Sequence, residues 1–316
     1  MRIAVTGGCG FIGSNLVKRL IDEGHTVTSV DDLSTGYIEF AHPGLENRYI
    51  RSFDDPVFLC DVINQKFDRV IHLAARARVS YSVAHPIETH DNNVTKSLRL
   101  IDACKGNVGR FVFASSSSVY GGAVAVSEAE RLNPRSPYAL QKMIIEQYLE
   151  QYQLHYGLES VALRFFNVFG PNSIGGGAYS MALTSWLTSI KEGRPMRSDD
   201  DGLQTRDMCY VDNTVQGVIK ATTCPVIPCF TAFNIACGKA VSNNEVLEYL
   251  QSRYPQAKRI DAPPRAGDIR HTLADIYAAQ TFLHYNPTVD AMDGVERTCQ
   301  WFDDNWEFIQ RLSRKS

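Results

Sequence analysis

The chain has 316 residues, of which 44% are hydrophobic and 21% charged, and its formal net charge is −3. This composition is typical of a globular protein with a large core, and the scattered lysines and arginines form no cluster that could follow a nucleic-acid backbone. No stretch approaches the roughly 18 apolar residues of a membrane span, and the first residues read as a strand, not as a signal peptide. The eight cysteines follow no zinc-ligand or disulfide spacing. We expect a reduced, cytoplasmic protein without a metal site, a nucleic-acid partner or a membrane partner.

The first half of the chain alternates strand-like and helix-like segments. Short β-rich runs lie at 2–6, 26–30, 69–74, 110–114 and 160–164, and helical patterns lie at 14–23, 91–105 and 137–155. Strands separated by helix-length segments predict right-handed βαβ units and a parallel sheet. The predicted class is therefore α/β, with a Rossmann-type doubly wound sheet over residues 1–166.

The pattern changes at about Asn167. Residues 175–177 read as a loop and 197–207 as a polar, acidic turn region, and shorter mixed elements then lead to a terminal helix that ends near Leu312. We expect residues 167–316 to form a smaller mixed α/β substrate lobe, interleaved with the core instead of folding separately.

A glycine-rich turn lies between the first strand and the first helix. In TGGCGFIG, the glycines at 7, 10 and 13 respectively allow a tight turn, a close approach to a pyrophosphate and close packing of helix on strand. The helix N-terminus adds N–H groups and partial positive charge for the phosphates. This arrangement predicts a dinucleotide site.

An acidic pair follows the second strand, about 18 residues after the last of these glycines. A carboxylate at Asp31, with Asp32 beside it, can accept hydrogen bonds from the adenosine ribose and repels a 2′-phosphate. The expected cofactor is therefore NAD, not NADP.

A phenol and an ammonium lie one helical turn apart at Tyr138 and Lys142. A serine run at 115–118 follows the strand at 110–114, and the carboxyl ends of the strands face the ligand crevice in a doubly wound sheet. The serine hydroxyls can therefore meet the phenol there. Neither pattern is specific by itself, because such pairs and serine-rich strand ends are both common.

Together these motifs resemble the extended short-chain dehydrogenase/reductase family, and within it the nucleotide-sugar 4-epimerases. The matching segments run along nearly the whole chain: TGGCGFIG at 6–13, VDDLSTG at 30–36, HLAA at 72–75, DNNV at 91–94, SSSSVYG at 115–121, SPYALQK at 136–142, LRFFNVFGP at 163–171, DGLQTRDMCYVDN at 201–213 and PPRAGDIRHTLAD at 263–275.

The resemblance implies a role for each matching residue. Tyr138 is the expected base, Lys142 lowers its pKa and holds the nicotinamide ribose, and Ser116 binds the sugar 4-oxygen. The implied cofactor contacts are Gly7, Gly10, Phe11, Ile12, Gly13, Asp31, Asp32, Ser34, Thr35, Gly36, Leu73, Ala74, Ala75, Asn92, Tyr138 and Lys142. The implied substrate contacts are Ser116, Ser117, Ser118, Tyr138, Asn167, Arg206, Arg265, Asp268 and Thr272, with the two arginines on the diphosphate.

Relatives of other activity remain alternatives. Sugar dehydratases carry acidic residues where this chain has Ser117 and Ser118, which favours simple epimerisation. Asn167 resembles the hexose and N-acetylhexosamine enzymes, and the small Thr272 should leave room for a 2-acetamido group. UDP-GlcNAc/UDP-GalNAc is therefore the preferred substrate pair. UDP-Glc/UDP-Gal is an additional or alternative pair, and UDP-glucuronate, a dehydratase or reductase, and a non-catalytic dinucleotide-sensing scaffold also stay open.

Two segments depart from the family pattern. Residues 197–201 replace an apolar stretch beside the nucleotide base, and Phe53-Asp54 replaces a Gly-Asp pair that faces the adenine. The adenine contact is therefore left unassigned. Apolar residues on more than one face of the helices at 91–105 and 137–155, together with the resemblance, predict a homodimer through a helix bundle.

Overall fold

Seven strands form one sheet at the centre of the computed structural model, which describes residues 1–174, 182–227, 229–264 and 269–314. Their order is β11-β6-β5-β4-β1-β2-β3, and neighbouring strands are parallel. They are β1 (Arg2–Thr6), β2 (Thr26–Asp31), β3 (Asn47–Ile50), β4 (Arg69–His72), β5 (Arg110–Ser116), β6 (Ser160–Phe165) and β11 (Thr231–Ile235). The chain builds outward from β1 on one side and then on the other, which confirms the predicted Rossmann-type doubly wound fold.

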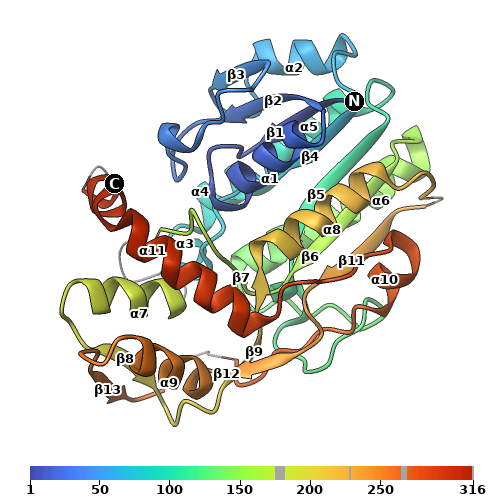
Figure 1. Ribbon diagram of the computed structural model, residues 1–316. Helices are drawn as coiled ribbons and strands as arrows, with labels where there is room; N and C mark the ends of the chain where they lie inside the picture. The colour runs from blue at the N-terminus through green and yellow to red at the C-terminus, as the bar shows by residue number, and fades with distance from the viewer. Residues whose placement is uncertain (175–181, 228, 265–268, 315–316) are drawn as a thin grey trace.

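The strands are apolar on both faces because helices cover both sides of the sheet. In β1, Ile3 and Val5 point into one hydrophobic cluster and Ala4 into the other, and all three are fully buried. α1 (Phe11–Asp22) and α8 (Val211–Thr223) cover the first face, and α2 (Pro56–Ile63), α5 (Lys96–Cys104) and α6 (Pro137–Tyr156) cover the second (Figure 1).

Local signals fix the ends of the helices that matter for the site. Gly24, at φ +82°, ends α1 as its sequence position predicts. The Ser136 hydroxyl caps α6 by accepting from the backbone N–H of Ala139 at 3.2 Å, and the left-handed Gly157 ends it. The predicted helix at 91–105 consists of a π-helical turn η2 (Asp91–Thr95) and α5, and it is preceded without a break by α4 (Pro86–His90). Short helical segments also occur as η1 (Ile38–Phe40), α3 (Val79–Ala84) and η3 (Ser117–Tyr120).

A smaller lobe lies beyond the carboxyl ends of the sheet strands, in the lower part of Figure 1. It contains α7 (Ala182–Lys191), β8 (Met196–Asp199), β9 (Thr205–Asp207), β12 (Ala240–Ser242), α9 (Asn243–Arg253) and β13 (Arg259–Ala262). The two-residue strands β7 (Val168–Phe169) and β10 (Cys209–Tyr210) pair with each other between the sheet and the lobe. The chain ends with α10 (Tyr277–Leu283) and the long α11 (Ala291–Ser313).

The prediction of a polar turn region at 197–207 holds only for the turn at 200–204, because β8 and β9 occupy the two ends of the region. Met196 and Ser198 point inward along β8 and are buried, while Arg197 is exposed and pairs with Asp199 at 2.6 Å. Two inward positions are too few to produce a visible alternation among so many charges. The predicted loop at 175–177 lies outside the described residues.

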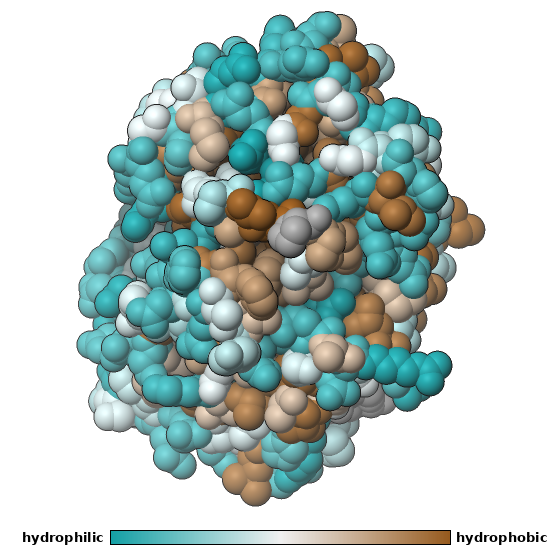
Figure 2. All heavy atoms as spheres, turned by 90° about the vertical axis from the view of Figure 1, so that its right-hand side faces the viewer, coloured by the Kyte–Doolittle hydropathy of each residue, from teal (hydrophilic) through white to brown (hydrophobic). Residues whose placement is uncertain are grey.

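The two halves of the chain are interwoven. β11 and α8, both beyond residue 166, belong to the sheet and its cover. The lobe boundary at 166 stays a prediction, although these elements show that the core draws on both halves. In the described ranges no helix is long and apolar enough to cross a membrane. The face seen in Figure 2 is largely hydrophilic, with small apolar patches between polar side chains.

Candidate active site

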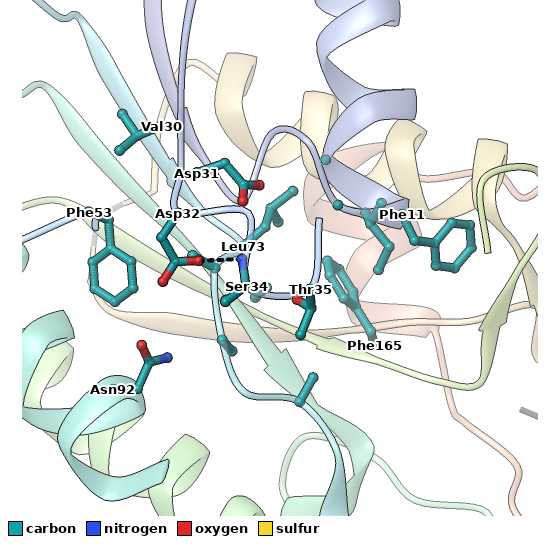
Figure 3. Close-up of a pocket in the computed structure, with 18 of the residues that line it drawn as sticks. Phe11, Val30, Asp31, Asp32, Ser34, Thr35, Phe53, Leu73, Asn92 and Phe165 are labelled. Carbon is teal, nitrogen blue, oxygen red and sulfur yellow. Dashed lines mark hydrogen bonds between the residues drawn. The ribbon is translucent and has the colours of Figure 1, made fainter. Parts of the chain in front are cut away.

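A groove runs along the carboxyl ends of the central strands and collects residues from distant parts of the sequence. It is lined by Gly7, Gly10, Phe11, Ile12, Gly13, Val30, Asp31, Asp32, Ser34, Thr35, Arg51, Phe53, Leu73, Ala74, Ala75, Ala77, Asn92, Ala114, Ser115, Tyr138, Lys142 and Phe165. In Figure 3, Phe53 and Asn92 lie on one side of the two aspartates and Phe11 on the other. All predicted cofactor contacts except Gly36 therefore line one groove.

The glycine-rich turn is packed so tightly that side chains are excluded. A Cβ on Gly13 would overlap the carbonyl oxygen of Gly7, and one on Gly7 would lie 2.9 Å from the backbone nitrogen of Ala74. Gly7 also has φ +75°, which side chains disfavour. Gly36 packs behind this turn, where a Cβ would lie 2.9 Å from the carbonyl oxygen of Cys9. It shapes the loop from outside the groove.

Asp31 is the anchor of this loop. Its carboxylate accepts from the backbone N–H groups of Cys9 and Leu33, each at 2.9 Å, and only 8% of the residue is exposed. Burial raises its pKa. Each carboxylate oxygen has a further lone pair, so Asp31 can still accept from ribose hydroxyls. Asp32 accepts from the backbone N–H of Ser34 at 3.0 Å (Figure 3).

Tyr138 and Lys142 meet the end of β5 at the inner end of the groove. Lys142 donates to the carbonyl of Ala114 at 2.7 Å, and its Nζ lies 5.7 Å from the centre of the Tyr138 ring. The Ser116 hydroxyl interacts with the phenol and lowers the pKa of Tyr138, which favours the phenolate. The structure thus brings together the three residues that were predicted to be catalytic.

Burial opposes the charged forms of both α6 side chains. It raises the pKa of Tyr138 to about 12, and the hydrogen bond with Ser116 offsets this only in part. It lowers the pKa of Lys142 to about 7, against a weaker opposite effect of Glu146. The expected lowering of the Tyr138 pKa by Lys142 therefore has to overcome desolvation, and positive charge brought by a ligand would help.

Two predicted substrate residues contact each other in the lobe. The Asn167 side-chain amide donates to Thr272 Oγ1 at 3.1 Å and to the carbonyl of Asp207 at 3.0 Å. Asn167 has φ +36°, which asparagine tolerates better than most residues, and it follows groove residue Phe165 by two positions. Because Asn167 is only two residues from Phe165, the contact between Asn167 and Thr272 lies near the groove.

Asp207 holds this corner together. Its carboxylate accepts from the backbone N–H groups of Cys237, Gly238 and Ala274 at 2.8, 3.0 and 3.2 Å, and it is fully buried. Burial raises its pKa to about 6. The lobe segment after residue 269 is thereby tied to the end of β11.

The remaining predicted substrate residues lie in η3, on β9 or outside the described residues. Ser118 donates to Ser116 Oγ from both its backbone and its hydroxyl, at 3.2 and 2.9 Å, and Ser117 precedes it in η3. Arg206, on β9, donates to the carbonyls of Thr205 and Arg270 at 3.0 and 3.3 Å. Arg265 and Asp268 lie outside the described residues, so their predicted contacts stay predictions.

Sequence reasoning missed Arg51 and left the contact of Phe53 unassigned, and both residues line the groove. Both follow β3, a strand that was not predicted because only one of its four residues is even half-buried. Asp54, from the pair that departs from the family pattern, binds the Ser52 hydroxyl and Arg99 instead, at 2.6 and 2.8 Å. The signal available in the sequence was the βα spacing between residues 31 and 56.

Comparison with known proteins identifies the family. The family model described as NAD dependent epimerase/dehydratase matches residues 3–236. The chain belongs to this family. A UDP-glucuronate 4-epimerase of Thermodesulfobacterium geofontis is 32% identical, with 98% of each chain covered. A solved UDP-N-acetylglucosamine 4-epimerase of Methanobrevibacter ruminantium, in complex with UDP-N-acetylmuramic acid, is 34% identical at TM-score 0.89 and covers 96% of this chain and 98% of its own. The UDP-glucose 4-epimerase of Thermus thermophilus, solved with NAD, is 29% identical at TM-score 0.84 and covers 96% and 99%.

NAD is the cofactor of this family member, and the residues present fit it. The side-chain-free turn at Gly7 and Gly13 lets a pyrophosphate approach the N-terminus of α1, which can supply N–H donors. Asp31 offers acceptors for the adenosine ribose, and Lys142 lies at the other end of the groove for the nicotinamide ribose.

Replacing Gly13 by alanine tests the packing of the turn. The added methyl group must push the Gly7 carbonyl away and open the turn, so we expect NAD to bind at least roughly tenfold more weakly, equivalent to about 1.4 kcal/mol. Calorimetric titration of cofactor-stripped protein measures this. Gly106→Ala is the control, because nothing lies within 4 Å of its Cβ although its φ is +71°. It should lose some stability but keep its NAD affinity. Unchanged affinity in Gly13→Ala would contradict the assignment.

Proposed function

We propose that this protein is an NAD-dependent UDP-sugar 4-epimerase whose preferred pair is UDP-GlcNAc and UDP-GalNAc. The observation that carries the proposal is the convergence of Tyr138, Lys142 and Ser116 at the inner end of a dinucleotide groove. When bound, NAD supplies the hydride acceptor and then the hydride donor for sugar C4, so each turnover regenerates it. The protein must move one proton and let a 4-keto sugar turn over.

The proton is assigned to Tyr138. Ser116 Oγ accepts two hydrogen bonds from Ser118, so its own proton is directed to the phenol oxygen or to the sugar 4-oxygen. As phenolate, Tyr138 would take the proton of the C4 hydroxyl while C4 loses its hydride. After the 4-keto sugar has turned over and C4 receives the hydride on its other face, the phenol would return the proton to the 4-oxygen. The Lys142 ammonium and the positive nicotinamide ring both favour the phenolate.

The polar groups around the site support epimerisation over dehydration. Removing water needs an acid and a base beside the sugar, and η3 offers the hydroxyls of Ser117 and Ser118 instead. Glu146 reaches the Ser115 hydroxyl from behind the strand, but Arg164 binds its carboxylate with 3.1 and 2.7 Å contacts. A carboxylate held in this way is a poor proton shuttle.

The choice of sugar rests on Asn167 and Thr272. Thr272, which accepts a hydrogen bond from Asn167, has a small side chain, and a larger residue at this position would fill the space proposed for the sugar. Relatives named for UDP-glucose, UDP-GlcNAc and UDP-glucuronate are similarly close, so they do not discriminate among these sugars. The argument for the acetylated pair is steric: a short side chain leaves room for an acetamido group.

A substrate panel tests the reaction. Purified protein without added cofactor should convert UDP-GlcNAc to its C4 epimer, followed by proton NMR, and Tyr138→Phe should lose at least about 100-fold in rate because the proton acceptor is gone. Turnover of UDP-glucose or UDP-glucuronate alone would keep the epimerase and overturn the sugar preference. A product of new mass, or no product from all three sugars, would overturn the UDP-sugar epimerase.

Thr272→Tyr tests the steric argument. We expect the kcat/KM ratio of UDP-GlcNAc to UDP-glucose to fall about tenfold or more, a typical cost of excluding a small group from a pocket. Thr272→Ser keeps the hydroxyl that Asn167 contacts and should leave the ratio unchanged. Equal loss for both sugars in Thr272→Tyr would mean that residue 272 does not select the acetamido group.

The proposed active form is a homodimer. A groove between α2, α5 and α6 is lined by the apolar or aromatic residues Leu59, Ile63, Val94, Leu98, Tyr148 and Tyr152, together with Arg99 and Asp102. Ile63 is 53% and Tyr148 39% exposed. Sedimentation should give about twice the 35.3 kDa chain mass. Tyr148→Asp should dissociate the dimer, whereas Leu154→Asp, exposed on the same helix outside this groove, should not. A monomer at micromolar concentration would contradict it.

A further inference from the structure

Helix α6 carries a third ionisable side chain in line with the two at the active site. Tyr138, Lys142 and Glu146 are four residues apart, so they share one stripe of the helix, and all three are buried. Glu146 has no part in the reaction steps described so far. Glu146 is 3% exposed, and removing a carboxylate from water is costly unless an opposite charge and hydrogen bonds compensate for the lost hydration.

The partners of Glu146 fix it to two strands. The Ser115 hydroxyl, at the end of β5, donates to its Oε1. Arg164, on β6, donates from Nε to Oε1 at 3.1 Å and from NH2 to Oε2 at 2.7 Å, with both side chains at most 6% exposed. Arg164 also donates to the Tyr120 hydroxyl at 2.8 Å. This two-pronged pairing holds the carboxylate in one orientation.

The strand residue that Glu146 holds lies between two residues that contact the active side chains. Ala114 accepts from the Lys142 amine, the Ser115 hydroxyl donates to Glu146, and Ser116 lowers the pKa of the Tyr138 phenol. Three consecutive residues of β5 are therefore matched to three consecutive turns of α6. The spacing between the phenol and the strand end depends on this match.

Glu146 also balances the charge around Lys142. The groups that face the Lys142 amine are Tyr138 on its own helix, the Phe113 ring at 4.6 Å on β5, and His72 on β4. Burial lowers the pKa of His72 to about 3, so it is neutral and does not compensate. Glu146 raises the pKa of Lys142, whereas desolvation, the larger effect, lowers it.

We propose that Glu146 is a positioning residue for the active site: it holds the Ala114-Ser115-Ser116 strand end against α6 and thereby sets the surroundings of the Lys142 amine. The catalytic consequence rests on the proposed epimerase function, whereas the effect on Lys142 does not. Without Glu146, the amine would lose its proton at a lower pH and with it the charge that favours the Tyr138 phenolate.

The test compares two glutamates that each pair with a buried arginine. Glu146→Gln removes the charge and keeps the size of the side chain. Glu159→Gln does the same to the partner of the fully buried Arg110 at the opposite end of β5. In protein with ¹³C-labelled lysine, the Lys142 resonance, assigned through Lys142→Arg, is followed against pH with and without NAD. We expect it to titrate at lower pH in Glu146→Gln and at the wild-type pH in Glu159→Gln. Equal titration in both variants would overturn the proposal.

Kinetics provide the second measurement. In Glu146→Gln we expect kcat for the UDP-sugar to fall by roughly tenfold at neutral pH, with the alkaline limb of its pH profile at lower pH and KM little changed, because the lost interaction acts on the base. Glu159→Gln should keep kcat. A wild-type protein that turns over no UDP-sugar would refute the epimerase while the lysine titration still decides the role of Glu146.

A shorter carboxylate separates charge from position and covers the case in which the glutamine variant does not fold. Glu146→Asp keeps the negative charge and withdraws it from Ser115. We expect Lys142 to titrate near its wild-type pH while kcat falls, since the strand end is no longer held. Wild-type kcat and pH profile in Glu146→Asp would overturn the positioning role.

Discussion

The close approach of α1 to the end of β1 is the constraint on which the site depends. The turn at residues 7–13 leaves no space for a side chain at Gly7 or Gly13. That packing directs the N-terminus of α1 into the groove and lets Asp31 reach the backbone N–H of Cys9 at 2.9 Å. Loop, helix and second strand thus form one rigid anion-binding corner, and the rest of the groove is arranged relative to it.

At the inner end of the groove, the proposed chemistry requires charged side chains in a place where burial has removed water. Burial raises the pKa of Tyr138 to about 12 and lowers that of Lys142 to about 7. A base and its cationic partner are useful there only if neighbouring groups compensate. Ser116 does so for the phenol, and Glu146, held by Arg164, does so for the amine.

The proposed sugar-binding corner lies in the interwoven lobe. Asp207 ties the backbone near Cys237 to that of Ala274, and Asn167 ties the end of β6 to Thr272. These hydrogen bonds join segments that are 30 to 105 residues apart in the sequence. The sugar corner can therefore vary through a few side chains such as Thr272 while the cofactor groove stays the same.

The sequence alone determined the parts of the protein that are local. The alternation of strands and helices predicted the doubly wound fold, and the glycine-rich turn, Asp31 and the Tyr138–Lys142 pair contributed to a family resemblance that implied sixteen cofactor contacts. Fifteen of these residues line the groove, and Gly36 supports the turn from behind it. The geometry of the glycine-rich turn and of the Tyr–Lys pair is set within a single turn or helix, so spacing is sufficient to recognise it. Arg51 was missed and the contact of Phe53 was left unassigned, because the exposed strand before them has no apolar pattern.

Tertiary structure decided what depends on pairing between elements. β8 and β9 are strands because each finds a partner strand far along the chain, and their own residues show no alternation strong enough to predict them. The role of Glu146 depends on Arg164, 18 residues away on another element, and on the register of α6 against β5. The sequence shows that both residues are present. Only the packing of α6 on the sheet brings the buried Glu146 carboxylate within hydrogen-bonding distance of Ser115 at the end of β5.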